Sequence, residues 1–369
     1  MGMFMEIQTQ FNGLSHHEIL RLDRDYEKAA RTIRLSYVSD SMPGITRRRK
    51  GKGFSYLDPE KKVVKEDFQL TRIKKLAVPP AWTKVWICAS LNGHIQATGY
   101  DLRQRKQYRY HELWNAARNE TKFHRLYEFG KALPLLRARL QQDLNRRSLC
   151  REKVIATVIS VMERTYIRIG NDDYEKLYGS YGMTTLKDGH VKIDGSNMKF
   201  SFVGKKGVAH DITLKNKRLA RIVKQCQDIP GKELFQYYDE NGGRHPIDSG
   251  MVNEYIKETL HADFTAKDFR TWAGSINLLH CLKEMDEPAT GSLCKKNILA
   301  ALDHVSVKLG NTRTVCRKYY VHPQLIQLYE HNTLKKYFTS AGKDISESED
   351  DLAAEEKILM RILKSLNAK

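Results

Sequence analysis

The sequence has no long hydrophobic run. Its most apolar segments fall short of the roughly 20 consecutive residues that a membrane-spanning helix needs. The first residues, MGMFMEIQTQ, contain neither the basic segment nor the apolar segment of a secretory signal. These absences argue against membrane-spanning and secreted proteins, so we expect a protein that works in the cytoplasm without a membrane partner.

Cysteine is sparse, and its spacing argues against a metal centre. The sequence contains no C-x-x-C pair and no cluster of cysteine and histidine at the spacing of a zinc site. Scattered single cysteines are typical of proteins in a reducing compartment, where disulfides do not persist. We therefore expect free thiols and no metal ligands among the six cysteines, which are Cys88, Cys150, Cys226, Cys281, Cys294 and Cys316.

Several catalytic motifs are missing as well. There is no G-x-x-x-x-G-K-[ST] loop for a nucleoside triphosphate, and no H-E-x-x-H, D-F-G or G-x-S-x-G motif. No acidic cluster outside the C-terminal tail resembles a two-metal nuclease site. An enzyme with this sequence is therefore expected to use no cofactor, and to act on DNA it would need a nucleophilic side chain.

Positive charge, by contrast, is plentiful. The 369 residues include 63 Lys and Arg against 44 Asp and Glu, which gives a formal net charge of +19. A surface of this kind attracts polyanions. Nucleic acid is the partner that this charge favours, although a membrane surface, a ribosomal particle or an acidic protein would also fit. The charge by itself predicts no chemistry.

The pattern of turns and hydrophobic periodicity predicts an α+β protein of several parts. We expect a small β-rich N-terminal lobe and a larger, mainly α-helical domain. Within the helical part, turn signals divide MTTLKDGHVKIDGSNMKFSFVGKKGVAHDITL into a three-stranded β-meander. The predicted parts are an N-terminal arm at 1–45, the β-rich DNA-binding lobe at 46–115, the helical catalytic domain at 116–340, and an acidic segment with an amphipathic helix at 341–369.

Two basic segments of the N-terminal lobe leave their roles open. TRRRKGKGFSYLD is either a solvated loop or an arm that contacts phosphates. In QYRYH, alternation along a strand would place Tyr108 and Tyr110 on one face, opposite Gln107. The tyrosines could be half-buried core residues, or the strand could present them to a DNA groove. The neighbouring cations favour DNA contact, and they are Arg103, Arg105, Lys106 and Arg109.

Cleavage of DNA without a metal ion requires a particular set of side chains. Attack on a phosphodiester passes through a pentacovalent phosphorus whose oxygens carry negative charge, and the planar, permanently charged guanidinium of arginine suits those oxygens. The leaving 5′-oxygen needs a proton, which a lysine can supply. Tyrosine, with a reference pKa of about 10, can be the nucleophile if its proton is removed during attack. Two arginines, one lysine and one tyrosine therefore suffice for cleavage of a phosphodiester without a metal ion.

The second half of the chain offers candidates for the cationic roles. Arg168 comes just before a glycine in YIRIGNDDY, where we expect a helix to end, and Lys205 lies in the predicted hairpin tip FVGKKG. Arg270 lies near the start of a predicted helix, with Lys267 one turn earlier. Taken singly, each also has an ordinary interpretation as a surface ion pair, a solvated turn lysine or a helix-surface charge.

The segment LGNTRTVCRKYYVHP supplies Asn311 and two adjacent tyrosines, Tyr319 and Tyr320. Asn311 alone could be a turn or N-cap residue. Neighbouring residues of a helix point about 100° apart, so at most one of the tyrosines can face a phosphate. The local sequence does not say which one.

Taken together and in this order, these segments resemble those of the type IB DNA topoisomerases, specifically the compact poxvirus-like branch found also in bacteria. The resemblance spans about residues 45 to 335 and rests on GKGFSYLD, VPPAW, HIQATGYDLRQRKQYRYH, RIGN with YGMTTL, FVGKKG, KDFRTWAG, and LGNT with YYVHP. Tyrosine recombinases share the chemistry, but their second arginine usually lies in H-x-x-R, whereas this chain has K-D-F-R. A DNA-binding protein without catalytic activity is the remaining alternative.

The resemblance implies a role for each cation. Arg168 and Arg270 would contact the scissile phosphate. Lys205 would act as the general acid, and Lys267 would assist the proton relay. The Q-Y-x-Y strand is similar to the family's groove contacts, which implies DNA contacts by three residues of that strand, namely Gln107, Tyr108 and Tyr110.

The resemblance also chooses between the tyrosines. In the family the nucleophile lies nine residues after the polar residue of G-[HN]-T, which is Asn311 here, and this spacing assigns the nucleophile to Tyr320. Tyr319 would then pack or support the site. Viral members often have histidine at the position of Asn311. Asparagine can still donate a hydrogen bond to a phosphate oxygen, but it cannot become cationic, so the pH profile should differ.

The activity implied by the resemblance is relaxation of supercoiled DNA. One strand of double-stranded DNA would be cleaved through a 3′-phosphotyrosyl intermediate, rotate and be resealed, without ATP or metal. We expect a monomer whose two lobes form a clamp around the duplex. Its location would be the cytoplasm, in association with the nucleoid.

Overall fold

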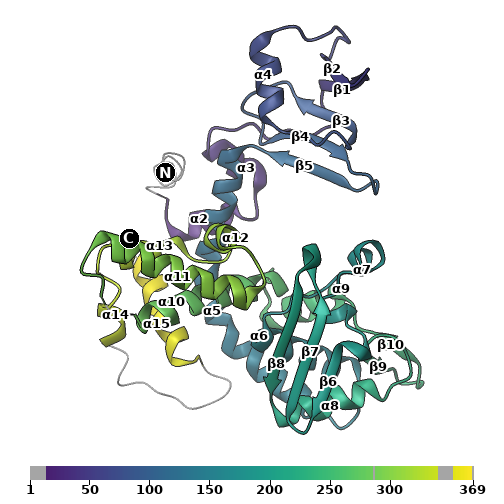
Figure 1. The fold of residues 1–369 in the computed structure, drawn as a ribbon, viewed down its shortest axis with the longest axis vertical. Coiled ribbons are helices and arrows are strands. Elements are labelled where there is room, and N and C mark those ends of the chain that lie inside the picture. The colour runs from purple at the N-terminus through teal and green to yellow at the C-terminus, as the bar shows by residue number, and fades with distance from the viewer. Residues whose placement is uncertain (1–13, 286, 340–351, 368–369) are drawn as a thin grey trace. The chain divides into compact units, whose positions relative to one another are not determined.

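The computed structural model describes residues 14–285, 287–339 and 352–367 (Figure 1). The chain divides into two compact units, residues 1–125 and 126–369, which are considered separately below. The first 13 residues of the predicted arm and the acidic run DISESEDD fall outside the described residues. None of the described helices is both long and apolar enough to span a membrane.

The first unit is built on an antiparallel sheet whose strands are ordered β2-β1-β3-β4-β5 (Figure 1). One face of this sheet packs on helix α4 through a small core that includes Ile45, Ile73 and Ile87. Residues 85–88 of TKVWIC and residues 96–99 of IQATGY are buried, as expected for central strands. The elements are β1 (Gly44–Lys50), β2 (Gly53–Leu57), α4 (Asp67–Lys75), β3 (Thr83–Cys88), β4 (Ile95–Tyr100) and β5 (Lys106–Tyr110).

Two short helices precede the sheet, α2 (His16–Leu22) and α3 (Tyr26–Thr32). Ser15 begins α2 with a capping box, and the side chain of Asp25 caps α3. Both helices pack on Trp114 at the start of the long helix α5 (Glu112–Leu144). The described part of the N-terminal arm is therefore ordered by contact with α5.

The second unit is mainly helical and has one large hydrophobic core. Helix α6 is buried on all sides from Lys153 to Met162, which is typical of a helix at the centre of a domain. The helices of this unit are α6 (Arg151–Thr165), α7 (Asp172–Tyr178), α8 (Lys217–Gln227), α9 (Ser249–Leu260), α10 (Ala266–Lys283), α11 (Gly291–Leu309), α12 (Arg313–Tyr319), α13 (Pro323–Glu330), α14 (Lys336–Thr339) and α15 (Ala354–Asn367).

The predicted three-stranded meander is confirmed as an antiparallel sheet ordered β6-β7-β8. Alternate residues of β7 are buried, among them Phe200 and Phe202, so this sheet has one face on the core. Its strands are β6 (Val191–Asp194), β7 (Asn197–Val203) and β8 (Ala209–Lys215). The short helical turns η1 (Met183–Thr185), η2 (Asp188–His190) and η3 (Lys205–Gly207) and the strand pair β9 (Gln236–Tyr238) and β10 (Arg244–Pro246) complete the unit. The predicted α+β class is confirmed.

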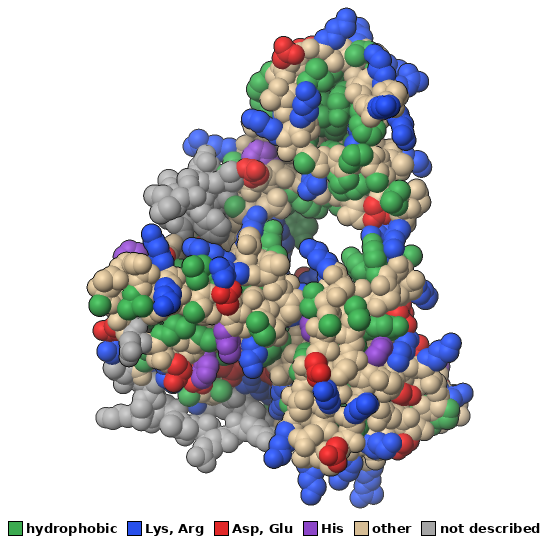
Figure 2. All heavy atoms as spheres, in the orientation of Figure 1, with side chains coloured by type: hydrophobic (Ala, Val, Ile, Leu, Met, Phe, Trp, Pro, Cys, Tyr) green, Lys and Arg blue, Asp and Glu red, His purple; other side chains and the backbone are tan. Residues whose placement is uncertain are grey.

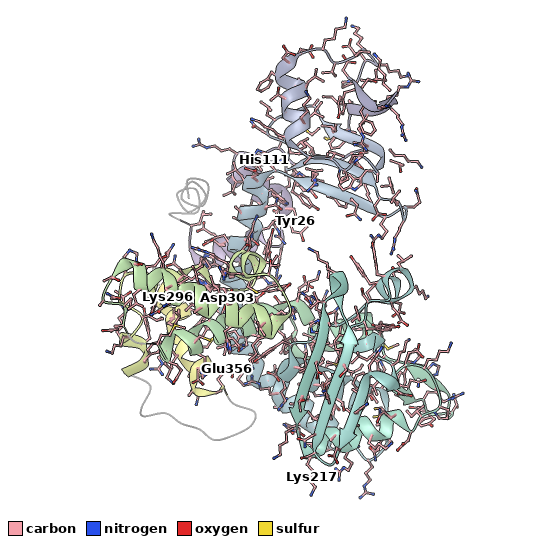
Figure 3. The ribbon with its side chains drawn as sticks, in the orientation of Figure 1. Tyr26, His111, Lys217, Lys296, Asp303 and Glu356 are labelled. Carbon is pink, nitrogen blue, oxygen red and sulfur yellow. The ribbon has the colours of Figure 1, made fainter. Side chains whose placement is uncertain are left out.

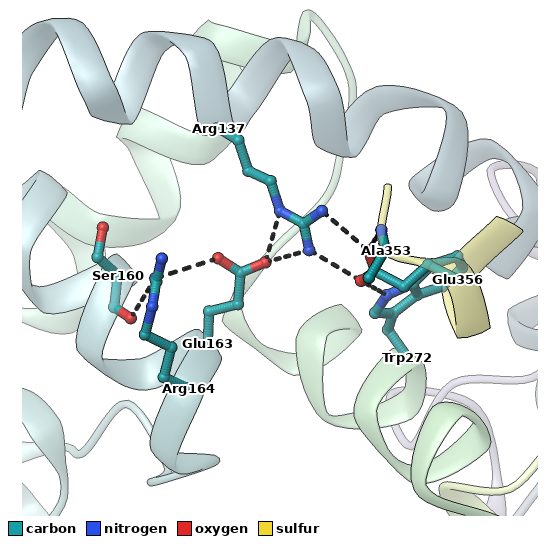
Figure 4. Close-up of polar contacts among 7 residues, drawn as sticks. All are labelled: Arg137, Ser160, Glu163, Arg164, Trp272, Ala353 and Glu356. Atoms are coloured by element: carbon teal, nitrogen blue, oxygen red, sulfur yellow. Dashed lines mark hydrogen bonds and ion pairs between the residues drawn. The ribbon is translucent and has the colours of Figure 1, made fainter. Parts of the chain in front are cut away.

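The amphipathic helix predicted near the C-terminus is confirmed as α15, and it carries a buried carboxylate into the core. Glu356 is 7% exposed and accepts hydrogen bonds from Arg137 of α5 at 2.8 and 2.9 Å and from Trp272 Nε1 of α10 at 2.8 Å (Figure 4). Arg137 also binds Glu163 of α6 at 2.7 Å. Burial alone would raise the pKa of Glu356, but the hydrogen bonds and charge of Arg137 outweigh it and lower that pKa. One guanidinium thus joins α5, α6 and α15, and Glu356 extends the network to α10.

Candidate active site

Arg168 lies just beyond α6, in an extended segment. The helix ends at Thr165, and Tyr166 takes a left-handed conformation with φ of 58°. The prediction that Arg168 immediately precedes a glycine-marked helix end is therefore wrong, because the helix stops before it. Arg168 and Ile169 are held instead by η1, where the N–H groups of Met183 and Thr184 each donate to their carbonyls at 2.7 Å.

Two glycines make this close contact with η1 possible. A Cβ on Gly182 would lie 2.5 Å from Gly170 Cα, so the two backbones could not approach if residue 182 had a side chain. Gly170 itself has φ of 99°, a conformation that favours glycine. The sequences RIGN and YGMTT therefore form one structure that positions Arg168.

The Arg168 guanidinium points to the turn between α11 and α12. Its Nη2 donates to Asn311 Oδ1 at 2.6 Å and to the Gly310 carbonyl at 3.3 Å. Asn311 Nδ2 lies 3.3 Å from the Leu309 carbonyl. Asn311 is therefore more than a turn residue, because it fixes the direction of a cation and keeps a second amide N–H as a donor, besides the one that donates to Leu309.

Arg270 is the buried cation of the site, at 6% exposure. It donates to the carbonyl of Tyr166, and its Nη2 donates to the carbonyl of Leu309 at 2.6 Å. Its Nε is buried and has no hydrogen-bond partner among the described residues. Burial, and then the nearby charge of Arg168, lower the pKa of Arg270, whereas Tyr320 acts to raise it. An anion at this place would offset the cost of burying the guanidinium.

Tyr320 lies over Arg270, with the guanidinium carbon 5.1 Å from the centre of its ring. Helix α12 ends one residue earlier, and the chain then passes close to α10. A Cβ on Gly274 of α10 would lie 2.5 Å from the Tyr320 carbonyl, so glycine is needed there. The next residue of α10, Ser275, accepts a hydrogen bond from the His322 N–H at 3.1 Å.

The two adjacent tyrosines have different surroundings. Tyr320 packs partly on the core and lines a hollow together with Arg168 and Asn311. Tyr319 is 38% exposed, does not line this hollow, and has Lys318 Nζ 5.3 Å from its ring centre. The geometry therefore separates the tyrosines in the same sense as the family spacing.

The hollow has a volume of about 890 Å³, and the charged residues of its lining are mostly basic. Its acidic lining residue, Asp211, is paired with Lys199 at 3.0 Å. An anionic ligand is therefore favoured. The basic side chains in the lining are Arg164, Arg168, Lys205, Lys206 and Lys308.

The two candidate lysines lie in different places. Lys205 is exposed at the β7–β8 tip, lines the hollow, and has its Nζ 5.4 Å from the ring centre of Tyr174. The next residue, Lys206, adopts φ of 64°, which turns the chain sharply at the tip. Lys267 is exposed in the first turn of α10 and does not line the hollow. The structure thus brings Lys205, but not Lys267, into the lining with Tyr320.

His210 belongs to the site but was missed in the sequence. Its ring stacks on Phe202, its partner across the β7–β8 pair, at 4.9 Å. A Cβ on Gly310 or on Gly204 would lie 2.4 or 2.7 Å from the ring, so the imidazole fits against two glycines. Burial, and then the charge of Arg168, lower the pKa of His210. The register of the GKKG hairpin, which places residue 210 opposite the buried Phe202, was the available signal.

No described residues form a group of three or more His, Cys, Asp or Glu side chains that could hold a metal ion.

The predicted DNA-contact strand β5 is largely exposed to solvent. Tyr108 and Tyr110 are exposed and their rings stack at 5.7 Å, so they are not core residues. The cations beside them are already paired: Arg105 binds Asp101 at 2.7 Å and Lys106 binds Asp40 at 2.7 Å.

Gln107 also donates to Asp101, at 3.0 Å. Carboxylates of the same unit therefore bind Arg105, Lys106 and Gln107. The other residues of β5, Tyr108, Arg109 and Tyr110, are exposed.

The basic run TRRRKGKG forms the β1–β2 hairpin and is not a loop. Arg47 is structural: it donates to the carbonyls of Val78, Pro79 and Trp82, and its guanidinium lies 4.2 Å from the ring centre of Phe54. The side chains of Arg48 and Arg49 are exposed, and no described residue forms a hydrogen bond or ion pair with them. Figure 2 shows Lys and Arg side chains gathered over this end of the first unit.

Comparison with known proteins decides the family. A family model described as "Eukaryotic DNA topoisomerase I, catalytic core" matches residues 105–345. The "DNA topoisomerase 1B" of Acanthamoeba polyphaga mimivirus is 33% identical over 333 residues, covering 88% of this chain and 95% of the viral protein. The chain belongs to the type IB DNA topoisomerases.

Within the type IB topoisomerases, the chain falls in the branch of poxvirus, mimivirus and bacterial enzymes. A second family model, "Bacterial DNA topoisomerase IB, N-terminal domain", matches residues 53–101. The "DNA topoisomerase 1B" of vaccinia virus (strain Copenhagen) is 22% identical over 241 residues, covering 62% of this chain and 71% of the viral protein. Neither family model reaches α2, α3 or α15.

Proposed function

We propose that this type IB topoisomerase relaxes supercoiled double-stranded DNA by breaking and resealing one strand. One observation carries the proposal: Tyr320 lines a basic hollow with Arg168, Asn311 and Lys205, and its ring lies 5.1 Å from the guanidinium carbon of Arg270. These are the side chains that metal-free cleavage of a phosphodiester needs.

In the first step, the Tyr320 oxygen attacks the scissile phosphorus. A bond forms from this oxygen to phosphorus as the phenol loses its proton to water, and the bond from phosphorus to the 5′-oxygen breaks. The DNA is left with a 3′-phosphotyrosyl end and a 5′-oxygen that takes up a proton to become a free hydroxyl. The phosphodiester count is unchanged, so resealing needs no ATP. The free strand then rotates about its partner, driven by torsion, and the 5′-hydroxyl attacks the phosphotyrosyl bond to reverse the reaction.

The arginines stabilise the negative charge that develops on the non-bridging oxygens of the phosphate. Arg168 is directed by its hydrogen bond to Asn311, and Arg270 is directed by two backbone carbonyls. Because both are fixed before the substrate binds, they lose little free energy to reorganisation in the transition state. Asn311 donates its remaining N–H to a non-bridging oxygen. Loss of one such donor typically lowers a rate ~10²–10³-fold.

Lys205 donates a proton to the leaving 5′-oxygen. Its place at an exposed hairpin tip on the rim of the hollow lets its ammonium group reach the end of the departing strand. The assignment of Lys267 to the same proton relay rests on the family resemblance. Lys267 precedes Arg270 by one helical turn, and this is what supports its part in the relay.

The remaining assignments concern DNA binding and organisation. We propose that the β-rich lobe at 46–115 and the catalytic domain at 116–340 form a clamp around duplex DNA, and that the chain acts as a monomer in the cytoplasm, at the nucleoid. Strand β5 contributes Gln107, Tyr108 and Tyr110 to the DNA contact.

Relaxation of a supercoiled plasmid tests this function. The wild-type protein is expected to relax both positive and negative supercoils in EDTA and without ATP. Tyr320→Phe should abolish relaxation and retain binding to duplex DNA, because only the attacking oxygen is lost. Tyr319→Phe is the matched control and should relax DNA at the wild-type rate. Loss of activity in Tyr319→Phe with retention in Tyr320→Phe would overturn the assignment.

A further inference from the structure

Four exposed tyrosines of the first unit form a surface that extends beyond β5. Tyr26, Tyr37, Tyr108 and Tyr110 are 46%, 45%, 42% and 40% exposed. They come from the start of α3, from the segment before β1, and from β5. Tyr26 and Tyr37 precede both regions that the family models match.

The rings are connected through two buried aromatic residues. Tyr37 stacks on His94 at 4.3 Å, and His94 lies 4.7 Å from Trp114 and 6.4 Å from Tyr110. Trp114 contacts the edge of Tyr26 at 6.2 Å. His94 and Trp114 therefore form the floor on which the outer rings lie. Figure 3 shows Tyr26 beside α5, the helix that carries Trp114.

The segment that carries Tyr37 is held firmly to the sheet. Ser36 N–H donates to the Asn92 carbonyl at 2.8 Å, and His94 N–H donates to the Ser36 carbonyl at 2.9 Å. Val38 N–H donates to His94 Nδ1 at 3.0 Å. The position of Tyr37 is thus set before any ligand binds, which lowers the entropic cost of a contact.

The hydroxyl groups of these tyrosines are close enough to affect one another. Burial, followed by the nearby phenols of Tyr108, Tyr37 and Tyr26, raises the pKa of Tyr110. Tyr110 is therefore neutral at pH 7, and a tyrosine hydroxyl can donate a hydrogen bond. Arg118, 4.7 Å from the ring centre of Tyr26, is paired with Asp23 at 2.8 Å.

The geometry favours duplex DNA over an unpaired strand. Tyr108 and Tyr110 stack on each other with an interplanar angle of 10°, and one face of Tyr37 is covered by His94. Side chains of a strand stand roughly perpendicular to the sheet, so a stacked pair presents its edges and hydroxyl groups outward. Hydroxyl groups donate to phosphates and base edges, whereas an unpaired base needs an open ring face.

We propose that Tyr26 and Tyr37 continue the DNA-contact surface of β5, so that the segment before β1 is part of the duplex-binding surface. The inference rests on the proposed function, since it presumes that β5 faces DNA. It assigns a role to the described part of the N-terminal arm. Because Lys106 and Arg118 are already paired with aspartates, the contribution of this surface comes from hydroxyl donors more than from net charge.

The test compares hydroxyl deletions that keep the rings. In a Tyr320→Phe background, which binds without cleaving, Tyr26→Phe with Tyr37→Phe should weaken binding to a labelled duplex roughly tenfold, through two lost hydrogen bonds. Tyr238→Phe, at a tyrosine of the second unit that is 40% exposed, is the control and should bind as its parent does. Equal affinities for the double variant and its parent would overturn the inference, as would a loss seen only with single-stranded DNA.

Nitration of the wild-type protein gives a second measurement that needs no variant. Duplex DNA should protect Tyr26 and Tyr37 from tetranitromethane and leave Tyr238 reactive, as read by peptide mass spectrometry. Unprotected Tyr26 and Tyr37 in the bound protein would contradict the inference. Plasmid relaxation keeps the two proposals apart: a wild-type protein that relaxes DNA while these tyrosines stay unprotected would leave the proposed function intact and remove the inference.

Discussion

Lys205 is the exposed member of the residues that surround the scissile phosphate in the proposed mechanism. Its ammonium is held by the β7–β8 tip, and Arg168 and Arg270 are held by backbone carbonyls and by Asn311. A group at an exposed tip suits proton transfer to a leaving strand, because it can follow that strand as it departs. The arginines, in contrast, must keep their place through cleavage and resealing.

Lys205→Ala should slow cleavage of an ordinary duplex ~10²–10⁴-fold, the usual contribution of a general acid. A substrate with a 5′-thiolate leaving group needs no proton, so it should restore the rate of the variant. Single-turnover cleavage of matched substrates with a 5′-oxygen or a 5′-sulfur leaving group measures both the loss and its restoration. If the sulfur substrate is cleaved as slowly as the oxygen substrate, Lys205 is not the acid.

Side chains that act by charge could be predicted from the sequence, and side chains that act by position could not. Arg168, Arg270 and Lys205 stand in segments whose residue types match the chemistry. Of the predicted catalytic residues, Arg168, Lys205 and Asn311 line one hollow with Tyr320. The place of His210 in the lining of the hollow depends on its fit against Gly204 and Gly310, which are far from each other in the chain. Such a fit is a property of the packed molecule.

At the scale of elements, we expect the β1–β2 hairpin to contact the phosphates of DNA. Arg48 and Arg49 extend from the strand β1 without acidic partners among the described residues. Each phosphate contact releases condensed counterions, which lowers the logarithm of the binding constant by about 0.9 per logarithmic unit of salt. Neighbouring residues of a strand point to opposite faces, so one of the two is expected to face the duplex. Replacing both arginines with alanine should therefore lower the salt slope of duplex binding by about 1.

Fluorescence anisotropy over a salt series measures this slope. Tyr238→Phe, which removes no charge, is the control and should keep the wild-type slope. An unchanged slope in the double alanine variant would show that the hairpin does not contact phosphates.

Helix α2 docks on α5 through a pair of histidines. His16 Nδ1 lies 3.1 Å from His124 Nδ1, and Glu120 lies 3.9 Å from His124 Nε2. Burial, and then the neighbouring His16, lower the pKa of His124 from 6.5 to about 4. The folded state therefore holds a neutral imidazole that becomes protonated more easily after unfolding.

Stability from His124 should be complete above pH 6.5 and should decline as the pH falls from 6.5 towards 4, because the unfolded state then binds more protons. The loss amounts to roughly 3 kcal/mol at most. Urea unfolding at pH 7.5 and pH 4.5 measures it. In His124→Gln, the free energy of unfolding should change less between the two pH values than in the wild type. An equal change would contradict the lowered pKa of His124.

Local turn signals predicted the meander, because DGSN and GKKG each specify a reversal within a few residues and lie between its strands. KDG contributes to the short helical turn η2 before β6. The end of α6 was predicted too late in the sequence, because a tertiary contact accompanies the end of this helix. Tyr166 leaves the helix in a left-handed conformation, and its carbonyl accepts a hydrogen bond from Arg270, more than a hundred residues away. The local sequence does not predict that contact.

At the scale of the whole molecule, the net charge of +19 predicts attraction to DNA, but it does not say which cations are available. Arg105, Lys106 and Arg118 are paired with aspartates of the same unit, whereas the hairpin arginines and the lining of the hollow have few acidic neighbours. The charge at these two places is therefore available to a polyanion.

The central claim is that Tyr320 joins covalently to a 3′ end of DNA. The most direct measurement is mass spectrometry of the covalent complex trapped on a nicked duplex, with fragmentation of the nucleotide-bearing peptide to locate the modified residue. The account predicts a phosphodiester on Tyr320, formed in EDTA and carrying the 3′ end of the cleaved strand. An adduct on Tyr319 or on any other residue, or relaxation of plasmid DNA without an adduct, would contradict it.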